Sequence, residues 1–442
     1  MSKNHFLLFF FLIGIKNSAQ TTFSLKQCVE YGLKNHRSNT IYANEKSSAD
    51  AKTKEISADY LPKAEVGFSV NNNLKLQQSI IPAGVFGPDE IRASLEQKYN
   101  SNAFIQLEQP IFDKAILTRL KNNKNLKEQA NLNIEQNHNQ IIYQISTSYF
   151  QIWTFRQQLE QLEFNQNNYQ QLIQIYDLQV KKGIILQKDL DKIIVDLNNT
   201  TAQIRVAESN ITLAENQLKY EMGFPLKDKI ELETPNDLQM ILFKENQEKM
   251  FTPETRIDYK LSKLNIKMLE IEKSAIKAEM LPKLSLSFQY GAVGFGDRFS
   301  QVYRDFYPYS TIGIKLSIPI LNFYKNNAQY KQADLSHKNA DEKLKLTEGK
   351  LTLEYENAQT KLLLAKTNVE NGLRNIDLAK SVLKVTDLQL QKGVTNLTDW
   401  LNTQNSLREA QNTYLSALYT YYQARVDLEM ANGTLKTFYK SY

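Results

Sequence analysis

The chain has 442 residues, a formal net charge of +6, and 42% hydrophobic and 23% charged residues, so its composition is that of a folded protein. The charge is small for this length and no basic patch is interleaved with aromatic residues, so nucleic acid is not an expected partner. A single cysteine excludes an internal disulfide and a thiolate metal cluster. The four histidines are scattered without ligand spacing. No catalytic triad or phosphate-binding glycine loop is visible, so the sequence predicts no enzyme and no cofactor.

The first segment, residues 1–19, has the layout of a secretory signal peptide. Lys3 provides a positive charge, an apolar run extends from Phe6 to Ile15, and Ala19 offers a cleavage site. The run is too short to span a bilayer. We therefore expect an exported protein.

Two strands are predicted next, over about 63–76 and 99–112. In the first strand Val66, Phe68 and Val70 alternate with polar or small residues, which is the period-two pattern of a strand with one apolar face. The connection between the strands, about 71–98, is rich in Gly, Asn and Pro and is expected to be a loop.

A long helical hairpin follows, over about 113–223. No proline occurs from Ile111 to Phe224, and Gly183 after Lys182 marks a turn between arms at roughly 113–182 and 187–223. An arm of seventy residues would be about 105 Å long at a rise of 1.5 Å per residue. A compact domain cannot enclose such a helix, so the arms must project.

The second half repeats this order after a linker at 224–252. Strands are predicted at about 283–291 and 308–321, and a second hairpin at about 324–432 turns at Lys392 and Gly393. Leu61-Pro62-Lys63 recurs as Leu281-Pro282-Lys283, and the residues around Gly183 recur around Gly393. We therefore predict that the chain is an internal duplication, with repeats at 20–223 and 253–442. Apolar residues in the arms step by three and four, which indicates a coiled-coil seam.

A sheet of four strands in one chain has an unpaired edge on each side unless it closes into a barrel. The strands of a soluble β-sandwich would also alternate between apolar and polar residues. However, Glu108, Gln289 and Lys315 on the polar face suit the inner wall of a water-filled barrel better. In lipid, four strands leave two open edges, which are not tolerated. Two chains give eight strands, which side chains would fill, whereas wider barrels leave an aqueous lumen. Three copies are therefore the preferred number. Aromatic residues near the strand ends, such as Tyr290, Tyr307 and Tyr309, suggest interfacial girdles or core positions.

The whole mature chain resembles the TolC-like outer membrane efflux protein family. The resemblance rests on the paired Leu-Pro-Lys motifs, on Gln109-Pro110-Ile111-Phe112, and on the two Lys-Gly turns with an aspartate six residues later. It implies a mainly α fold with a small β part, built from a duplicated helix-strand-strand-hairpin unit. Three copies would form a 12-stranded β-barrel in the outer membrane, continued by a long periplasmic α-helical barrel. The implied function is a passive efflux duct of a tripartite efflux or type I secretion system, in contact with outer membrane lipid.

The resemblance also assigns roles to a few residues. Lys182, Gly183, Lys392 and Gly393 would form the periplasmic tip that docks onto an adaptor protein of an inner-membrane transporter. Family members with an acidic constriction carry Asp-x-x-Asp after the second turn, and here the matching residues are Asp399 and Asn402. Three Asp399 carboxylates would favour cations at a narrow point. The alternative for Asp399 is the N-cap of the following helix.

The main alternative function is a soluble periplasmic coiled-coil adaptor or scaffold. That protein would be released by osmotic shock, whereas a channel would fractionate with the outer membrane as an oligomer.

Overall fold

The computed structural model describes residues 22–85, 87–94, 96–233, 251–320 and 323–442. The predicted signal peptide, residues 1–19, lies outside the described residues. The chain divides into two compact units. Among the described residues, the helical unit comprises 22–42, 134–233, 251–257 and 348–442, and the sheet unit comprises 43–85, 87–94, 96–133, 258–320 and 323–347. Each unit draws on both sequence repeats.

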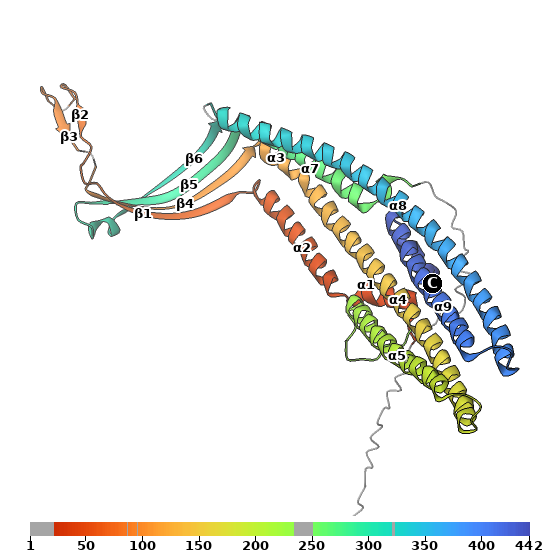
Figure 1. Ribbon diagram of the computed structural model, residues 1–442. Coiled ribbons are helices and arrows are strands. Elements are labelled where there is room, and N and C mark those ends of the chain that lie inside the picture. The colour runs from red at the N-terminus through yellow and green to blue at the C-terminus, as the bar shows by residue number, and fades with distance from the viewer. Residues whose placement is uncertain (1–21, 86, 95, 234–250, 321–322) are drawn as a thin grey trace, which may run out of the picture. The chain divides into compact units, whose positions relative to one another are not determined.

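The sheet unit is built on four antiparallel strands in the order β1-β4-β5-β6 (Figure 1). The strands are β1 (Lys63–Asn72), β4 (Tyr99–Phe112), β5 (Lys283–Gly296) and β6 (Phe306–Ser317). The central pair β4–β5 joins the two repeats, with Gln106 opposite Gln289. A separate small hairpin, β2 (Ser79–Ile81) with β3 (Ile91–Ala93), lies in the connection between β1 and β4, where the sequence predicted only a loop.

Helices precede each strand pair. They are α1 (Leu25–Asn35), α2 (Arg37–Ala58) and, in the second repeat, α7 (Ile257–Ala278). The start of α1 is fixed by a capping box in which Ser24 and Gln27 satisfy each other's backbone N–H groups. Both α2 and α7 end shortly before Leu-Pro-Lys, because the residue before a proline disfavours the helical conformation.

Two long helical hairpins follow the strand pairs (Figure 1). The first consists of α3 (Lys114–Leu120), α4 (Asn122–Lys181) and α5 (Gln187–Met222). The second consists of α8 (Phe323–Gln391) and α9 (Leu397–Asn432), and the chain continues into the short α10 (Leu435–Phe438) and η3 (Tyr439–Ser441). Two further single-turn helices in the described residues are η1 (Pro253–Thr255) and η2 (Gln301–Tyr303). The predicted fold class, mainly helical with two strand pairs and two hairpins, is confirmed.

Aromatic residues dominate the core of the helical unit. Phe150 of α4 stacks on Tyr422 of α9 with ring centroids 4.4 Å apart, and Trp153 meets the same tyrosine edge-on at 5.8 Å. Cys28 of α1 is fully buried in the same cluster. Because α4 belongs to the first repeat and α9 to the second, this core ties the two repeats together.

In the part of the chain that the structure describes, no helix has a stretch long and apolar enough to cross a lipid bilayer.

Candidate functional site

One face of the four-stranded sheet is apolar and open. Residues that lie directly opposite one another in an antiparallel sheet point to the same face, so the strand pairing defines the face without ambiguity. Val66 is 79% exposed and Ile314 is 71% exposed. The large side chains of this apolar face are Val66, Phe68, Ile105, Leu107, Phe288, Tyr290, Ile312, Ile314 and Leu316. So large an exposed apolar surface indicates contact with a membrane or another protein.

The opposite face is polar over most of its length. Its side chains include Glu65, Gln106, Glu108, Ser285, Ser287, Gln289, Thr311 and Lys315. Glu108, Gln289 and Lys315 thus share one face, as the alternation predicted. Toward the loop end of the sheet this face also carries aromatic rings. Phe104 lies over Gly67, and the Tyr309 hydroxyl lies 3.0 Å from Asn102 Oδ1. Tyr309 and Tyr307 therefore lie on the polar face, while Tyr290 lies on the apolar one.

Both outer strands of this sheet have an open edge. Among the described residues β1 pairs only with β4, and β6 pairs only with β5. Backbone N–H and C=O groups on such edges are templates for further strand pairing. Whether water or lipid covers the apolar face, this sheet has unpaired backbone groups along both edges and can pair with a further strand at each.

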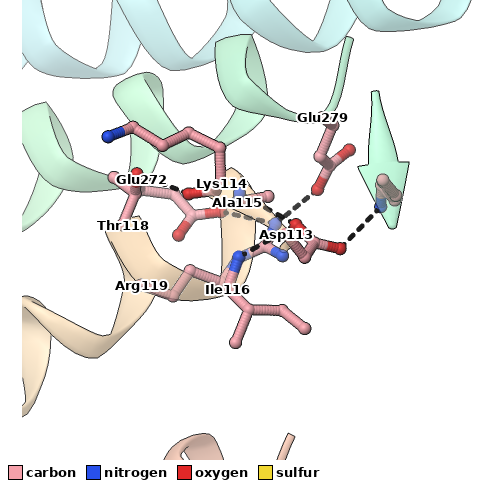
Figure 2. Close-up of polar contacts among 9 residues, drawn as sticks. Asp113, Lys114, Ala115, Ile116, Thr118, Arg119, Glu272 and Glu279 are labelled. Atoms are coloured by element: carbon pink, nitrogen blue, oxygen red, sulfur yellow. Dashed lines mark hydrogen bonds and ion pairs between the residues drawn. The ribbon is translucent and has the colours of Figure 1, made fainter. Parts of the chain in front are cut away.

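The passage from β4 into the first hairpin is held by a small polar network, shown in Figure 2. Asp113 caps α3 by accepting hydrogen bonds from the backbone of Ala115 at 2.9 Å and Ile116 at 3.2 Å. Its other oxygen lies 3.2 Å from Nζ of Lys283, the first residue of β5. One carboxylate thus fixes both the helix start and the neighbouring strand.

Arg119 lies six residues after Asp113, in the same short helix α3. Its guanidinium lies 2.5 Å from Glu279 and 3.6 Å from Glu272. Figure 2 shows both glutamates on the side of α3 that faces α7. Partial burial acts to lower the pKa of Arg119, but the hydrogen bonds and charges of Glu279 and Glu272 together outweigh it, so the pKa is raised. The contacts tie α3 of the first repeat to α7 of the second. Sequence reasoning missed these contacts, because Arg119 is about 160 positions from Glu279 in the sequence. Only Asp113, directly after a strand, was a local signal.

The two predicted tip turns have the same backbone geometry. Gly183 has φ +72° and Gly393 has φ +68°, in the left-handed region that favours glycine. Gly183 donates to Val180 at 2.9 Å, and Ile184 donates to Gln179 at 2.9 Å, which is a Schellman motif. Gly393 and Val394 make the same two bonds to Leu390 and Gln389. Lys182 and Lys392 precede these glycines and are exposed, as are the glycines themselves.

The predicted constriction residues lie at the start of α9. Asp399 and Asn402 are both exposed. The N-cap of this helix is Asn396, whose side chain accepts a hydrogen bond from the Asp399 backbone at 2.9 Å, so the N-cap alternative for Asp399 is wrong. The Asp399 carboxylate instead accepts from the Thr395 hydroxyl at 3.2 Å. An acid in the first helical turn also favours the positive end of the helix dipole.

A compact cluster lies beneath these turns and was not predicted. Trp400 packs with Leu397 and Leu401 of α9 against Tyr169 of α4 and Ile193 of α5. In addition, Lys192 of α5 contacts the Thr398 hydroxyl at 3.2 Å. The ends of the two hairpins therefore touch through both apolar and polar groups.

Comparison with known proteins gives a consistent result. Residues 272–434 match the family model described as outer membrane efflux protein. The alkaline protease secretion protein AprF of Pseudomonas aeruginosa is 25% identical over 177 residues. That match covers 39% of this chain, and the chain spans only about a third (35%) of the length of AprF.

Solved structures cover nearly the whole chain. A structure of CusC, described in terms of transmembrane channel formation, has a TM-score of 0.77 at 16% identity and covers 92% of this chain and 91% of its own. The fold is that of the TolC-like outer membrane efflux proteins. The CmeC outer membrane channel of Campylobacter jejuni has a TM-score of 0.71 at 17% identity, over 94% of this chain and 88% of its own. In this TolC-like fold the two hairpins and the two strand pairs described above account for most of the chain.

Proposed function

We propose that the protein is the outer membrane duct of a tripartite efflux or type I secretion system. The observation that carries the proposal is the four-stranded sheet, which has an exposed apolar face, a polar face and two open edges. The match of residues 272–434 to the outer membrane efflux family and the similarity to AprF support it. The protein resides in the outer membrane and extends into the periplasm.

Three copies form the duct. Their twelve strands close a barrel whose apolar face contacts outer membrane lipid and whose polar face lines water, and closure removes every open edge. The hairpins continue this duct as a helical tunnel. The protein has no catalytic step in this role: it is a passive conduit, and the energy for export comes from the inner-membrane partner.

The tip turns dock onto the periplasmic adaptor of that partner. Lys182, Gly183, Lys392 and Gly393 are exposed, and among the described residues a Cβ added at either glycine would meet no atom within 4 Å. The two turns therefore give each chain two surfaces with the same backbone geometry, and a trimer six. Such a repeated surface suits an adaptor that binds in several copies.

Asp399 sets ion preference at the tunnel entrance. In a trimer its exposed carboxylate occurs three times at one level, and rings of carboxylates favour cations. Asn402 adds no charge at the next helical turn, so the preference is weaker than in a duct with two acidic rings.

Conductance of the purified protein in planar lipid bilayers tests this function. We expect discrete ion-conducting steps, a preference for cations, and a lower preference in Asp399→Asn. A protein that is released by osmotic shock and never conducts would instead fit the periplasmic scaffold.

A further inference from the structure

The connection between β5 and β6 folds back onto the sheet. Residues 297–305, which contain η2, make up this return turn. The carbonyl oxygen of Val302 accepts a hydrogen bond from the Ser101 hydroxyl of β4 at 2.7 Å, and both residues are fully buried. The ring of Tyr303 stacks on Phe68 of β1 with ring centroids 6.5 Å apart. The return turn therefore reaches from β5 across β4 to β1.

Strand pairing shows which face of the sheet the return turn covers. Ser101 lies opposite Gly294 in the β4–β5 pair and opposite Val70 in the β1–β4 pair, so its side chain points to the apolar face together with that of Val70. Phe68, which stacks on Tyr303, lies two residues before Val70 and belongs to the same face. The return turn therefore lies on the apolar side of the sheet.

Two glycines of β5 make room for the return turn. A Cβ at Gly294 would collide with the Val302 carbonyl oxygen, and a Cβ at Gly296 would lie 2.6 Å from Cβ of Gln301. The Gln301 side chain accepts hydrogen bonds at 3.0 Å from the first two backbone N–H groups of the turn. These contacts give the turn a fixed shape and satisfy backbone groups locally, as a segment against an apolar face requires.

The outer surface of the return turn combines aromatic rings with two arginines. Phe299 is 57% exposed and Tyr303 is 44% exposed, and their ring centroids are 5.6 Å apart. Arg298 and Arg304 are exposed, and neither guanidinium forms an ion pair within the described part of the chain. Aromatic rings at the level of the headgroups, with long basic side chains that reach them, are typical of a membrane interface.

We infer that the return turn binds lipid at the outer boundary of the membrane, with Arg298 and Arg304 contacting phosphate groups of the headgroups. The inference rests on the proposed function, in which the apolar face contacts lipid. The helices adjoin the opposite ends of β5 and β6 and extend into the periplasm in the proposed duct, so the return turn lies at the outer side. Phe299 and Tyr303 then lie where acyl chains meet headgroups.

Two features favour lipid as the partner over a neighbouring copy of the chain. A neighbouring copy would meet the sheet at its outer strands, whereas the buried hydrogen bond of the return turn is to the central strand β4. The turn also carries Asp297 and Asp305, so its net charge is zero. Binding therefore depends on the short-range fork geometry between guanidinium and phosphate, and long-range attraction contributes little.

Quenching by a brominated phospholipid tests the position of the return turn. A bimane fluorophore is attached to Ser300→Cys, since Ser300 is exposed and its side chain does not cap η2. The matched controls are the successive β6 positions Ile312→Cys on the apolar face and Thr311→Cys on the polar face. Cys28 is fully buried and stays unlabelled. In vesicles of phosphatidylcholine brominated near the headgroup, the labels at 300 and 312 should be quenched and the label at 311 should not.

The pattern of quenching separates two kinds of failure. If the label at 312 is quenched and the label at 300 is not, the return turn does not contact lipid and the inference is overturned, while the duct stands. If the label at 312 also stays bright, the apolar face is not in the bilayer and the proposed function itself fails.

The double variant Arg298→Gln/Arg304→Gln tests the phosphate contacts. Native mass spectrometry counts phosphatidylglycerol bound to the detergent-solubilised protein at a series of lipid concentrations. We expect roughly threefold to tenfold weaker binding, since each exposed ion pair contributes only modestly. The matched control Lys75→Gln/Arg92→Gln removes two exposed positive charges from the β1–β4 connection and should bind like the native protein.

Three results would overturn the assignment of the two arginines. The first is unchanged binding by the Arg298/Arg304 variant, and the second is an equal loss in the Lys75/Arg92 control, which would reflect total charge alone. The third is displacement of phosphatidylglycerol by an equal concentration of inorganic phosphate, which would indicate a site for the free anion and not for a lipid.

Discussion

At the scale of single residues, the two tip glycines show where the backbone limits the sequence. An added Cβ at Gly183 or Gly393 would meet no atom within 4 Å, so space is not what excludes a side chain. The positive φ is the constraint. Gly223 differs, because there an added Cβ would come within 2.7 Å of the Asn35 carbonyl oxygen.

We therefore expect the backbone preference of the residue that replaces either tip glycine to matter more than the size of its side chain. Asparagine adopts the left-handed region readily, whereas a β-branched residue does not. Gly183→Asn/Gly393→Asn should retain the stability of the turns, while Gly183→Val/Gly393→Val should cost about 1–2 kcal/mol per turn. Protease cleavage at the turns and export activity would measure this. Equal behaviour of the two variants would show that the left-handed backbone is not what these positions require.

Glu221 near the end of α5 is a buried acid with a defined pH effect. Burial raises its pKa, and the hydrogen bond from Gln217 and the nearby His36 offset this only in part. A raised pKa in the folded state means that the protonated form is favoured, so this contribution to stability is present below the ordinary carboxyl pKa and is lost as the pH rises through the folded one. Glu221→Gln should therefore gain stability over the native protein at pH 7.5 but not at pH 4. Thermal unfolding of both proteins at the two pH values, with exposed Glu208→Gln as control, measures this. A gain that is the same at both pH values would contradict it.

At the scale of elements, local sequence signals were sufficient for the four long strands and the two helical hairpins. Proline-free stretches, glycine after lysine, and period-two alternation predicted the hairpins and the two faces of the sheet. The interruption at Lys121 between α3 and α4 was missed, because no proline or glycine marks it. The β2–β3 hairpin was missed because its strands have three residues each, too few for periodicity. The Arg119 network was missed because its partners are distant in sequence.

A polar pair in the seam between α4 and α9 allows a prediction at this scale. Gln404 donates to Asn165 at 3.2 Å, and both side chains are almost fully buried. Removing one member leaves the other without a partner, which costs about 1–3 kcal/mol, whereas replacing both with apolar groups can be neutral or stabilising. Asn165→Leu should therefore destabilise the protein, and Asn165→Leu/Gln404→Leu should recover most of the loss. A double-mutant cycle of thermal unfolding measures the coupling, and additive losses would show that the pair does not act as a unit.

At the scale of the whole molecule, the duplication explains why one chain is not enough. Each repeat supplies two strands and one hairpin, and the contact between repeats within the chain leaves the outer edges of both repeats open. The sequence alone predicted these open edges, because the alternation of apolar and polar residues is a local pattern that reveals four strands per chain. The way in which the two repeats join within the chain needed the structure, since it depends on how β4 and β5 pair.

The mass of the protein extracted from outer membranes in mild detergent tests the central claim most directly. We predict a single species with three copies of the chain, because three sets of four strands close the sheet around a water-filled bore. A species with one copy, stable and with its sheet edges open, would contradict the account.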